Sequence, residues 1–308
     1  MTTPVRDFVG YGSNPPDPKW PGGARVAIQI VMNYEEGSER SVLDGDDRSE
    51  TEGWEASGIA AAGVLMPPAR RDLISESHFE YGSRVGFWRL MGIFAEHGVP
   101  ITVGACALAL ERNPEAARAI IAAGHEICCH GWRWMGHHEL SEEREREVIG
   151  MAVSSIKATA GVRPLGWYTR YAPSLNTRRL LVEEGGFLYD SDAYGDDLPY
   201  WVEVGDRPHL VIPYAFDTND MQFKLPAGFA TAEEFFSYLR DTFDFLYLEG
   251  AKTPKMTSIG LHARLGGRPG RAMGLVRFLE YIKRHQQVWV CRRVDIARHW
   301  LERHPYRG

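Results

Sequence analysis

Carboxylate and imidazole side chains stand at the ends of several apolar runs in this sequence. Glu35 and Glu36 follow the run "ARVAIQIVMNY", His130 follows "HEICC", and His262 follows "MTSIGL". A carboxylate in a pocket of low dielectric can act as a general base, and a histidine can protonate a leaving group. These residue types therefore predict acid–base chemistry, provided that the fold brings the ends of the runs together.

A metal site is the main alternative use of the same residues. A helix-like pair starting from His130 would need its second histidine at position 134, which is Trp134. His137 and His138 lie in a polar segment and are interpreted as solvated loop residues. A catalytic zinc ion normally needs three protein ligands and a water. An irregular site made of Glu36, His130 and one of the two later histidines stays open as an alternative.

Other side chains could bind a small, flat substrate near these groups. Arg170, in "WYTRYAPS", could donate forked hydrogen bonds to a carbonyl or carboxylate, or could simply steady a neighbouring acid. Asp192, in "YDSDAYGDD", could orient Arg170 or a histidine. Aromatic rings could form the walls of the pocket. The candidates for these walls are Trp132, Trp134, Tyr168 and Tyr171.

Strand-like and helix-like segments alternate along most of the chain. "HEICCHG", "PLGWYTR" and "VWVCRR" are typical of strands, and "PITVGACALAL" is also expected to form one. "NPEAARAIIAAG" opens with an N-cap asparagine and a first-turn proline, which is typical of a helix. About seven strand–helix units predict a (β/α) barrel, in which functional side chains gather where the strands end. We expect one catalytic domain over 1–308, with an N-terminal arm over 1–23 and a long surface excursion over 38–79.

Composition and charge exclude several classes of partner. The 308 residues carry a net charge of −6, with Lys and Arg scattered among acids, so a nucleic-acid partner is not expected. No apolar run approaches the roughly 18 residues that span a bilayer, so we expect no membrane partner and a cytoplasmic location. The four cysteines lack CxxC spacing, which argues against a disulfide scaffold or a thiolate zinc site.

The same residues resemble the motifs of the polysaccharide deacetylase superfamily, over nearly the whole chain from Ala24 to the last helix. "NYEEG" stands where the family has Thr-Phe-Asp-Asp-Gly, "HGWRW" is similar to its His-Ser/Thr-x-x-His motif, "RYAP" to its Arg-x-x-Pro motif, and "IGLH" to its Leu-x-x-His strand. The resemblance implies a distorted (β/α)7 barrel. It also implies that Glu35 is the general base, that Glu36 and His130 are metal ligands, and that His262 is the general acid.

The departures from the family pattern indicate a lost metal site. Trp134 stands in place of the second histidine ligand, so at most Glu36 and His130 remain for a metal. These substitutions, together with "YGSRVGFWR" and "AGHEICCHG", resemble the cofactor-independent allantoinase branch of the superfamily. That resemblance implies metal-independent hydrolysis of the hydantoin ring of allantoin to allantoate in purine breakdown. It also implies a cytoplasmic homo-oligomer, with a tetramer expected, that needs no cofactor.

In the resulting hypothesis, Glu35 or Glu36 takes a proton from water, which attacks the ring carbonyl, and His262 protonates the departing nitrogen. Arg170 and His130 would hold the carbonyl oxygen. Two alternatives stay open. One is a metal-dependent deacetylase or cyclic imidase of the same superfamily, and the other is a barrel that binds ureides or sugars without catalysis.

Overall fold

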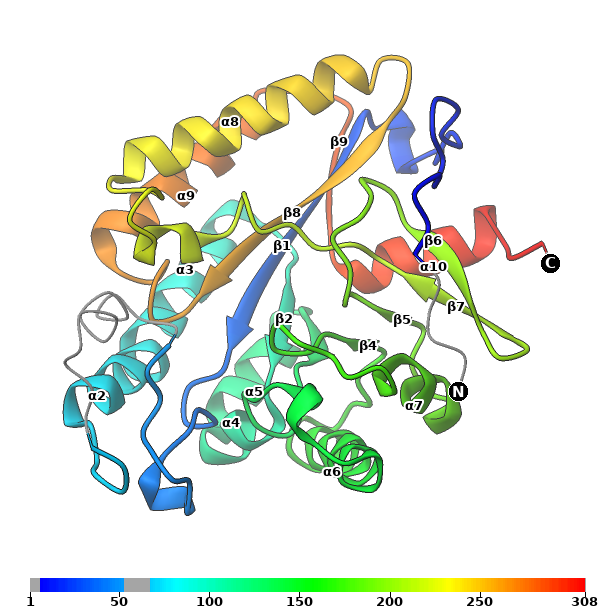
Figure 1. Cartoon of the computed structure of the whole chain (residues 1–308). Coiled ribbons are helices and arrows are strands. Elements are labelled where there is room, and N and C mark those ends of the chain that lie inside the picture. The colour runs from blue at the N-terminus through cyan, green and yellow to red at the C-terminus, as the bar shows by residue number, and fades with distance from the viewer. Residues whose placement is uncertain (1–5, 53–66, 308) are drawn as a thin grey trace.

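The protein is a curled sheet with helices packed around its outer side (Figure 1). The computed structural model describes residues 6–52 and 67–307. In this part of the chain, nine strands form one sheet in the order β6-β7-β5-β4-β3-β2-β1-β8, and β9 pairs with the beginning of β1. The strands are β1 (Val26–Tyr34), β2 (Thr102–Ala105), β3 (Glu126–Cys129), β4 (Gly166–Trp167), β5 (Tyr189–Asp190), β6 (Tyr200–Val204), β7 (Arg207–Val211), β8 (Lys255–His262) and β9 (Val288–Cys291).

The sheet is an incomplete barrel centred on β1. All its strand pairs are parallel except the β6–β7 hairpin. β1 is buried along its whole length, as its unbroken apolar run predicts, and it pairs with β8 on one edge and with β9 and then β2 on the other. Between β7 and β8 the described residues form one isolated β-bridge, Asn219 to Gly260, and no continuous strand pairing closes the sheet there. The predicted distorted (β/α)7 barrel is thus confirmed.

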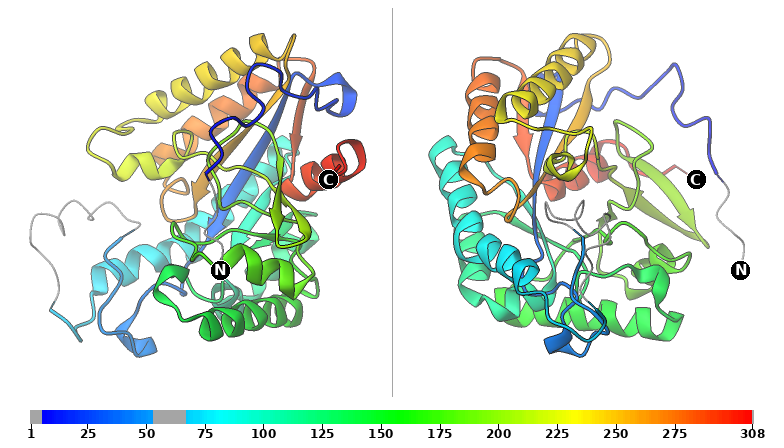
Figure 2. Two further views of the ribbon diagram at one scale, coloured as in Figure 1. Left: turned by 45° about the vertical axis from the view of Figure 1, so that its right-hand side comes forward. Right: turned by 60° about the vertical axis from the view of Figure 1, so that its left-hand side comes forward.

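Helices cover the convex side of the sheet (Figure 2). The pair α8 and α9 packs over one part of it, while α4, α5 and α6 cover the opposite part (Figure 1). The helices are α2 (Leu73–Tyr81), α3 (Phe87–His97), α4 (Ala107–Arg112), α5 (Pro114–Ala122), α6 (Glu142–Ala160), α7 (Thr177–Glu184), α8 (Ala232–Glu249), α9 (Pro269–Ile282) and α10 (Arg293–Arg303). A π-helical turn, η3 (Gly82–Gly86), joins α2 to α3, and a 3-10 turn, η5 (Asp220–Lys224), follows β7.

The helix ends follow the punctuation in the sequence. The Asn113 side chain accepts a hydrogen bond from the backbone of Ala116 at the start of α5, as predicted. The expected strand over "PITVGACALAL" is correct only in its first part, because β2 ends at Ala105 and α4 begins at Ala107. The Ala and Leu residues of "ALAL" are strong helix formers, and three of them bury their side chains from the helical conformation.

Two parts of the chain differ from the expected layout. The excursion 38–79 was expected on the surface, but Ser38, Glu50 and Phe79 are buried and α2 begins within it. Burial of Glu50 is compensated by an ion pair described below. The β6–β7 hairpin lacks a helix between its strands and was not predicted. Residues 1–5 of the arm and 53–66 of the excursion lie outside the described residues.

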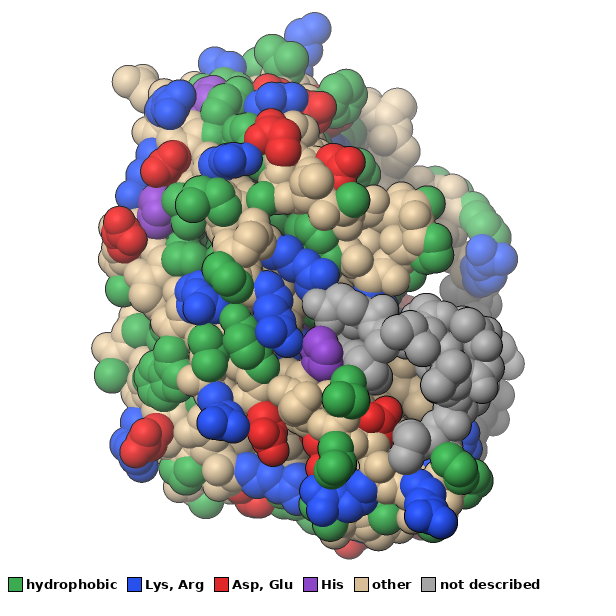
Figure 3. Space-filling view, turned by 90° about the vertical axis from the view of Figure 1, so that its left-hand side faces the viewer, with side chains coloured by type: hydrophobic (Ala, Val, Ile, Leu, Met, Phe, Trp, Pro, Cys, Tyr) green, Lys and Arg blue, Asp and Glu red, His purple; other side chains and the backbone are tan. Residues whose placement is uncertain are grey.

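The outer surface carries charges of both signs. On the face shown in Figure 3, basic side chains lie among acidic and apolar ones. Among the described helices, none is long and apolar enough to cross a membrane.

Candidate active site

The structure brings seven of the ten predicted site residues to one narrow cavity at the carboxyl ends of the strands. They are Glu35, His130, Trp134, Tyr168, Arg170, Tyr171 and His262. Five further residues complete the lining, and the sequence analysis did not single them out. They are Asn33, Tyr214, Phe216, Asn219 and Met221. Because β1, β3, β4 and β8 are parallel, the residues that follow them meet at the same end of the barrel.

Glu35 lies at the centre of the polar contacts. One carboxylate oxygen, Oε1, lies 3.2 Å from His130 Nε2 and 3.6 Å from His262 Nε2, and the other lies 2.6 Å from Arg264 Nη2. Burial by itself would raise the pKa of Glu35, but the charge of Arg264 and the two histidines outweigh that effect and hold the pKa well below its ordinary value. Glu35 is therefore an ionised carboxylate facing the cavity.

His130 is held by contacts on both of its ring nitrogens. Nδ1 lies 2.6 Å from the carbonyl oxygen of Tyr168, and Nε2 faces Glu35. The ring also stacks on that of Tyr168, with centroids 4.9 Å apart. Because the carbonyl can only accept, Nδ1 carries a proton, and the second contact is a hydrogen bond only if a further proton lies between His130 and Glu35. These contacts fix the orientation of the His130 ring, with Nε2 directed at Glu35.

His262 forms a buried pair with Asp220, a residue that the sequence analysis missed. Asp220 Oδ1 lies 2.7 Å from His262 Nδ1, while Oδ2 accepts hydrogen bonds from the backbone of His262 and of Gly266, each at 2.7 Å. The carboxylate therefore fixes the ring so that Nε2 points toward Glu35. Asp220 begins η5, nine residues after β7 ends, in a stretch without periodic pattern. The signal that could have found it is an acid in a segment that crosses the gap of the barrel.

Glu36 turns away from the cavity and contacts the loop after β8. Its carboxylate accepts hydrogen bonds from the backbone of Glu35 at 2.9 Å and of Arg264 at 3.2 Å. Burial and the adjacent charge of Glu35 raise the pKa of Glu36, and Arg264 opposes this rise. β1 ends at Tyr34, and Glu36 lies in the turn that the Ser38 N–H closes on the Glu35 carbonyl, so its side chain leaves the side that Glu35 lines.

Arg170 is buried at the outer wall of the cavity, but its partner is not the predicted one. Its guanidinium lies 2.8 Å from the Glu50 carboxylate, donates to the Trp134 carbonyl at 2.8 Å, and stacks 3.5 Å from the centroid of the Trp134 ring. The expected role of Asp192 is therefore corrected, because its carboxylate accepts two hydrogen bonds from Thr169, both at 2.7 Å. Glu50 could not be identified as the partner because it lies 120 residues before Arg170.

The remaining predicted residues lie outside the cavity. Trp132 packs against the apolar core rather than forming a wall, which corrects the expectation for this ring. The interpretation of His137 as a solvated loop residue is wrong, because its ring is buried with Nδ1 3.0 Å from Glu145 Oε1, whereas His138 is exposed as expected. The irregular metal site considered from the sequence would need one of these histidines beside Glu36, and the structure does not bring them together.

The side chains do not fit the metal ion that the family resemblance implies. The position of the second histidine ligand is filled by the indole of Trp134, which offers only an N–H donor. Both oxygens of Glu36 already accept hydrogen bonds from backbone N–H groups, and its side chain turns away from the cavity. Within residues 6–52 and 67–307, no group of three or more His, Cys, Asp or Glu side chains could hold a metal ion.

Tyr171 closes the outer side of the cavity in a strained conformation. Its φ of 49° lies in the left-handed region that non-glycine residues rarely adopt, and the Ala172 N–H donates to the Arg170 carbonyl across it. The hydroxyl donates to the Met221 sulfur at 3.2 Å. Tyr171 and Arg170 also line a wider, polar pocket on the outside. The two residues thus separate the cavity from solvent.

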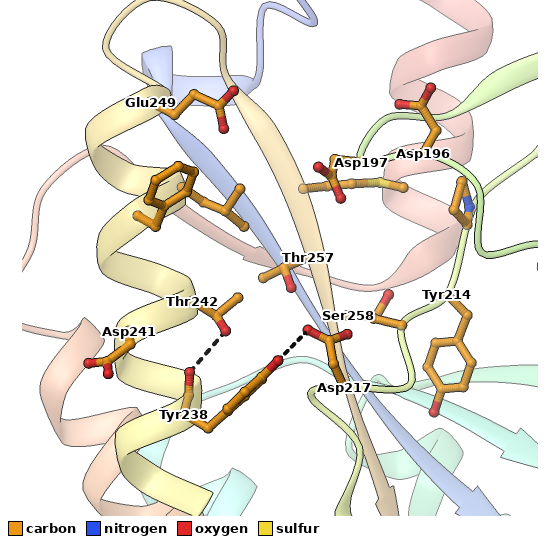
Figure 4. A pocket seen from close by; sticks show the side chains of 15 residues that line it. Asp196, Asp197, Tyr214, Asp217, Tyr238, Asp241, Thr242, Glu249, Thr257 and Ser258 are labelled. Atoms are coloured by element: carbon orange, nitrogen blue, oxygen red, sulfur yellow. Dashed lines mark hydrogen bonds between the residues drawn. The ribbon is translucent and has the colours of Figure 1, made fainter. Parts of the chain in front are cut away.

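A larger groove lies between α8, β8 and the segment that follows β7 (Figure 4). Its rim carries Asp196, Asp197, Asp217, Asp241 and Glu249, and Tyr238 donates a hydrogen bond to Asp217. The described residues that line this groove include no histidine, so it lacks the carboxylate–imidazole pairing seen in the narrower cavity.

Comparison with known proteins places the chain among deacetylase-like hydrolases. The polysaccharide deacetylase family profile matches residues 75–189. A Schizosaccharomyces pombe protein named "Putative polysaccharide deacetylase" is 41% identical over 324 residues, which cover 99% of each chain. Two solved structures are each 52% identical and cover 98% of this chain and 99% of their own. One is described as a "probable Polysaccharide deacetylase" from Pseudomonas aeruginosa PAO1 and has a TM-score of 0.92; the other is "Puue Allantoinase", with a TM-score of 0.91.

Proposed function

The chain belongs to the polysaccharide deacetylase family, and we propose that within this family it is a metal-independent allantoinase. The observation that carries the proposal is the pairing of an ionised Glu35 with the His262–Asp220 pair across a cavity whose neighbouring side chains do not fit a metal. The 52% identity to Puue Allantoinase supports the choice of substrate.

The cavity suits a small, flat, neutral ring. Aromatic rings of Tyr168, Tyr171 and Tyr214 line it, and the buried residues Asn33 and Asn219 add carboxamide groups to the lining. Allantoin has amide-like donors and acceptors that can pair with such groups. A polysaccharide would need a long open groove at the same place. The closure of the cavity by Tyr171 therefore favours a single small ring over a chain of sugars.

The proposed reaction uses Glu35 as the base, which decides between the two glutamates left open by the sequence. Glu35 takes a proton from a water whose oxygen attacks the ring carbonyl, the carbon–nitrogen bond of the ring breaks, and His262 gives its Nε2 proton to the leaving nitrogen. Asp220 holds that histidine in place. His130, together with Arg170 at the wall, stabilises the carbonyl oxygen as negative charge develops, an effect worth a few kcal/mol per donor, about 3 for a well-placed one.

Allantoin hydrolysis with and without a chelator tests this function. We expect allantoate to form at the same rate in both conditions, with less than one metal ion per chain by elemental analysis. Loss of turnover on chelation and its return with zinc would overturn metal independence. The match to a protein described as a probable polysaccharide deacetylase gives a second candidate, and release of acetate from acetylated glucosamine oligomers without turnover of allantoin would select it.

The cytoplasmic location and the tetramer implied by the family resemblance stay predictions. Light scattering on the purified chain would test the tetramer.

A further inference from the structure

Another arginine, Arg264, lies two residues beyond the end of β8, and its side chain is fully buried. Its Nη2 lies 2.6 Å from Glu35 Oε2, and its Nη1 lies 3.4 Å from Glu36 Oε1. A buried guanidinium is costly unless it is paired, and a pair of adjacent buried carboxylates is costly without a cation. The three groups therefore stabilise one another. Burial by itself would lower the pKa of Arg264, but the negative charges of Glu35 and Glu36 outweigh that effect and raise the pKa above its ordinary value.

Apolar rings keep this cluster dry. The Arg264 guanidinium carbon lies 4.5 Å from the centroid of Phe79 and 4.9 Å from that of Trp134. On the other side, Gly82 of η3 lies against Glu36, and a Cβ at this position would come within 2.4 Å of the carboxylate. The "YGSRVGFWR" segment therefore needs a glycine at position 82, where it covers the Glu36 side chain. Water has little room to replace Arg264 as the partner of the two glutamates.

The positions involved are those that the family uses for a metal. Glu35 and Glu36 stand where the family has its base and an acidic ligand, and Trp134 stands where it has its second histidine. In this chain the positive charge beside both carboxylates comes from Arg264, and the ring of Trp134 packs on that guanidinium. The indole does not merely remove a ligand, because it also covers the cation.

We propose that Arg264 is a built-in cation that has replaced the metal ion of the family, with Trp134 as its cover; the inference rests on the proposed hydrolytic function. Arg264 is a positioning residue, because it touches Glu35 and Glu36 and does not line the cavity. It places a positive charge between the two adjacent carboxylates and fixes the orientation of Glu35 toward the cavity. A guanidinium has no vacant coordination site, so oxygen stabilisation falls to His130 and Arg170.

Metal binding by variants tests the replacement directly. We expect that W134H/R264M binds about one Co²⁺ per chain after dialysis and shows a cobalt absorption band, because the double substitution supplies a histidine and frees the two glutamates. The wild-type chain, W134H and the matched control W134H/R170M should each bind less than a tenth as much. The control removes the other arginine on the same ring but leaves Arg264 between the glutamates.

Several outcomes would overturn the proposal. Stoichiometric cobalt in W134H alone would show that Arg264 does not hold the place of the metal. A folded W134H/R264M, judged by circular dichroism, that binds no cobalt would do the same. If that variant does not fold, W134H/R264Q replaces it, with the same expectation. Cobalt binding needs no substrate, so failure here is distinct from a wild-type chain that leaves allantoin intact.

Turnover gives a second test of the positioning role. We expect R264A to lower kcat about 10²–10³-fold with a small change in KM, R264K to recover part of the loss, and added guanidinium chloride to restore R264A where urea at equal concentration does not. A loss of kcat that neither lysine nor guanidinium relieves would overturn the role of the charge.

Discussion

Two buried histidine–carboxylate pairs in this protein look alike locally and differ in what surrounds them. His262 lies 2.7 Å from Asp220 and His137 lies 3.0 Å from Glu145, and all four side chains are at most 4% exposed. The second ring nitrogen of His262 faces Glu35 across the cavity, whereas the His137 ring meets the edge of Trp167 in the core. The comparison teaches that burial and a carboxylate partner do not define an acid–base group; an adjoining cavity and a second ionised group do.

Glu145, the carboxylate of the pair that lies in the core, has a structural role. Glu145 also accepts hydrogen bonds from Ser174 and Thr177, and these contacts fasten α6 to the start of α7. Both carboxylate oxygens therefore contact protein donors. In the pair at the cavity, His262 Nε2 instead lies 3.6 Å from Glu35 Oε1, which is longer than a hydrogen bond. A substrate atom in the cavity can therefore become the hydrogen-bond partner of Nε2.

The largest effect should come from replacing the two histidines in parallel. We expect His262→Gln to lower kcat about 10³-fold with little change in KM, because the leaving nitrogen loses its proton donor. His137→Gln should keep kcat within about threefold and lower the melting temperature instead. Steady-state kinetics and thermal melts of both variants test this prediction. Equal losses of kcat would contradict a catalytic role for His262 and a structural role for His137.

The carboxylate partners should separate in the same way, with a smaller kinetic effect. Asp220→Asn should lower kcat by about 10²-fold, because the amide no longer holds the imidazole in the right orientation and tautomer. Glu145→Gln should cost about 1–3 kcal/mol in the free energy of unfolding, since three buried contacts are weakened, while turnover persists. Urea unfolding and initial rates measure the two quantities. A Glu145 variant that is as inactive as the Asp220 variant would contradict the assignment.

A buried carboxylate without a histidine sharpens the comparison through pH. Burial raises the pKa of Glu39 from 4.5 to about 7. Its protonated form is favoured in the folded state, so its contribution to stability is complete below pH 4.5 and is lost as the pH rises through 7. We expect Glu39→Gln to be more stable than the wild type at pH 8, by about 2–3 kcal/mol, with the advantage absent at pH 4. Urea unfolding at both pH values tests the sign.

The smallest effect concerns the two tryptophans of "GWRW". Trp132 packs outside the cavity, so Trp132→Phe should leave KM and kcat within about twofold. Trp134→Phe keeps a ring under both arginines but reduces the contact area, and it should raise KM several-fold. Steady-state kinetics of the two variants, measured in parallel, test this prediction. Equal changes in KM would show that the Trp134 ring contributes no more to the cavity than the Trp132 ring does.

Much of the fold and part of the site could be predicted, because they depend on interactions between residues that are close in the sequence. Apolar runs such as 26–34 form buried strands in any context that buries both faces, and capping residues such as Asn113 end helices through contacts with their own neighbours. Reactive residues directly after such strands had to meet at one end of a parallel barrel. That argument places Glu35, His130 and His262 together without knowledge of any loop.

The sequence by itself thus determined most of the strands, the barrel and the types of reactive side chains at its rim. Only the tertiary structure decided which groups pair: Asp220 with His262, Glu50 with Arg170, and Arg264 with both glutamates. Each of these partners lies on or next to an irregular loop whose path follows no periodic pattern. These ion pairs form because the folded chain must compensate each buried charge with an opposite one. Which charges become buried together depends on the paths of the loops, and a sequence pattern does not predict those paths.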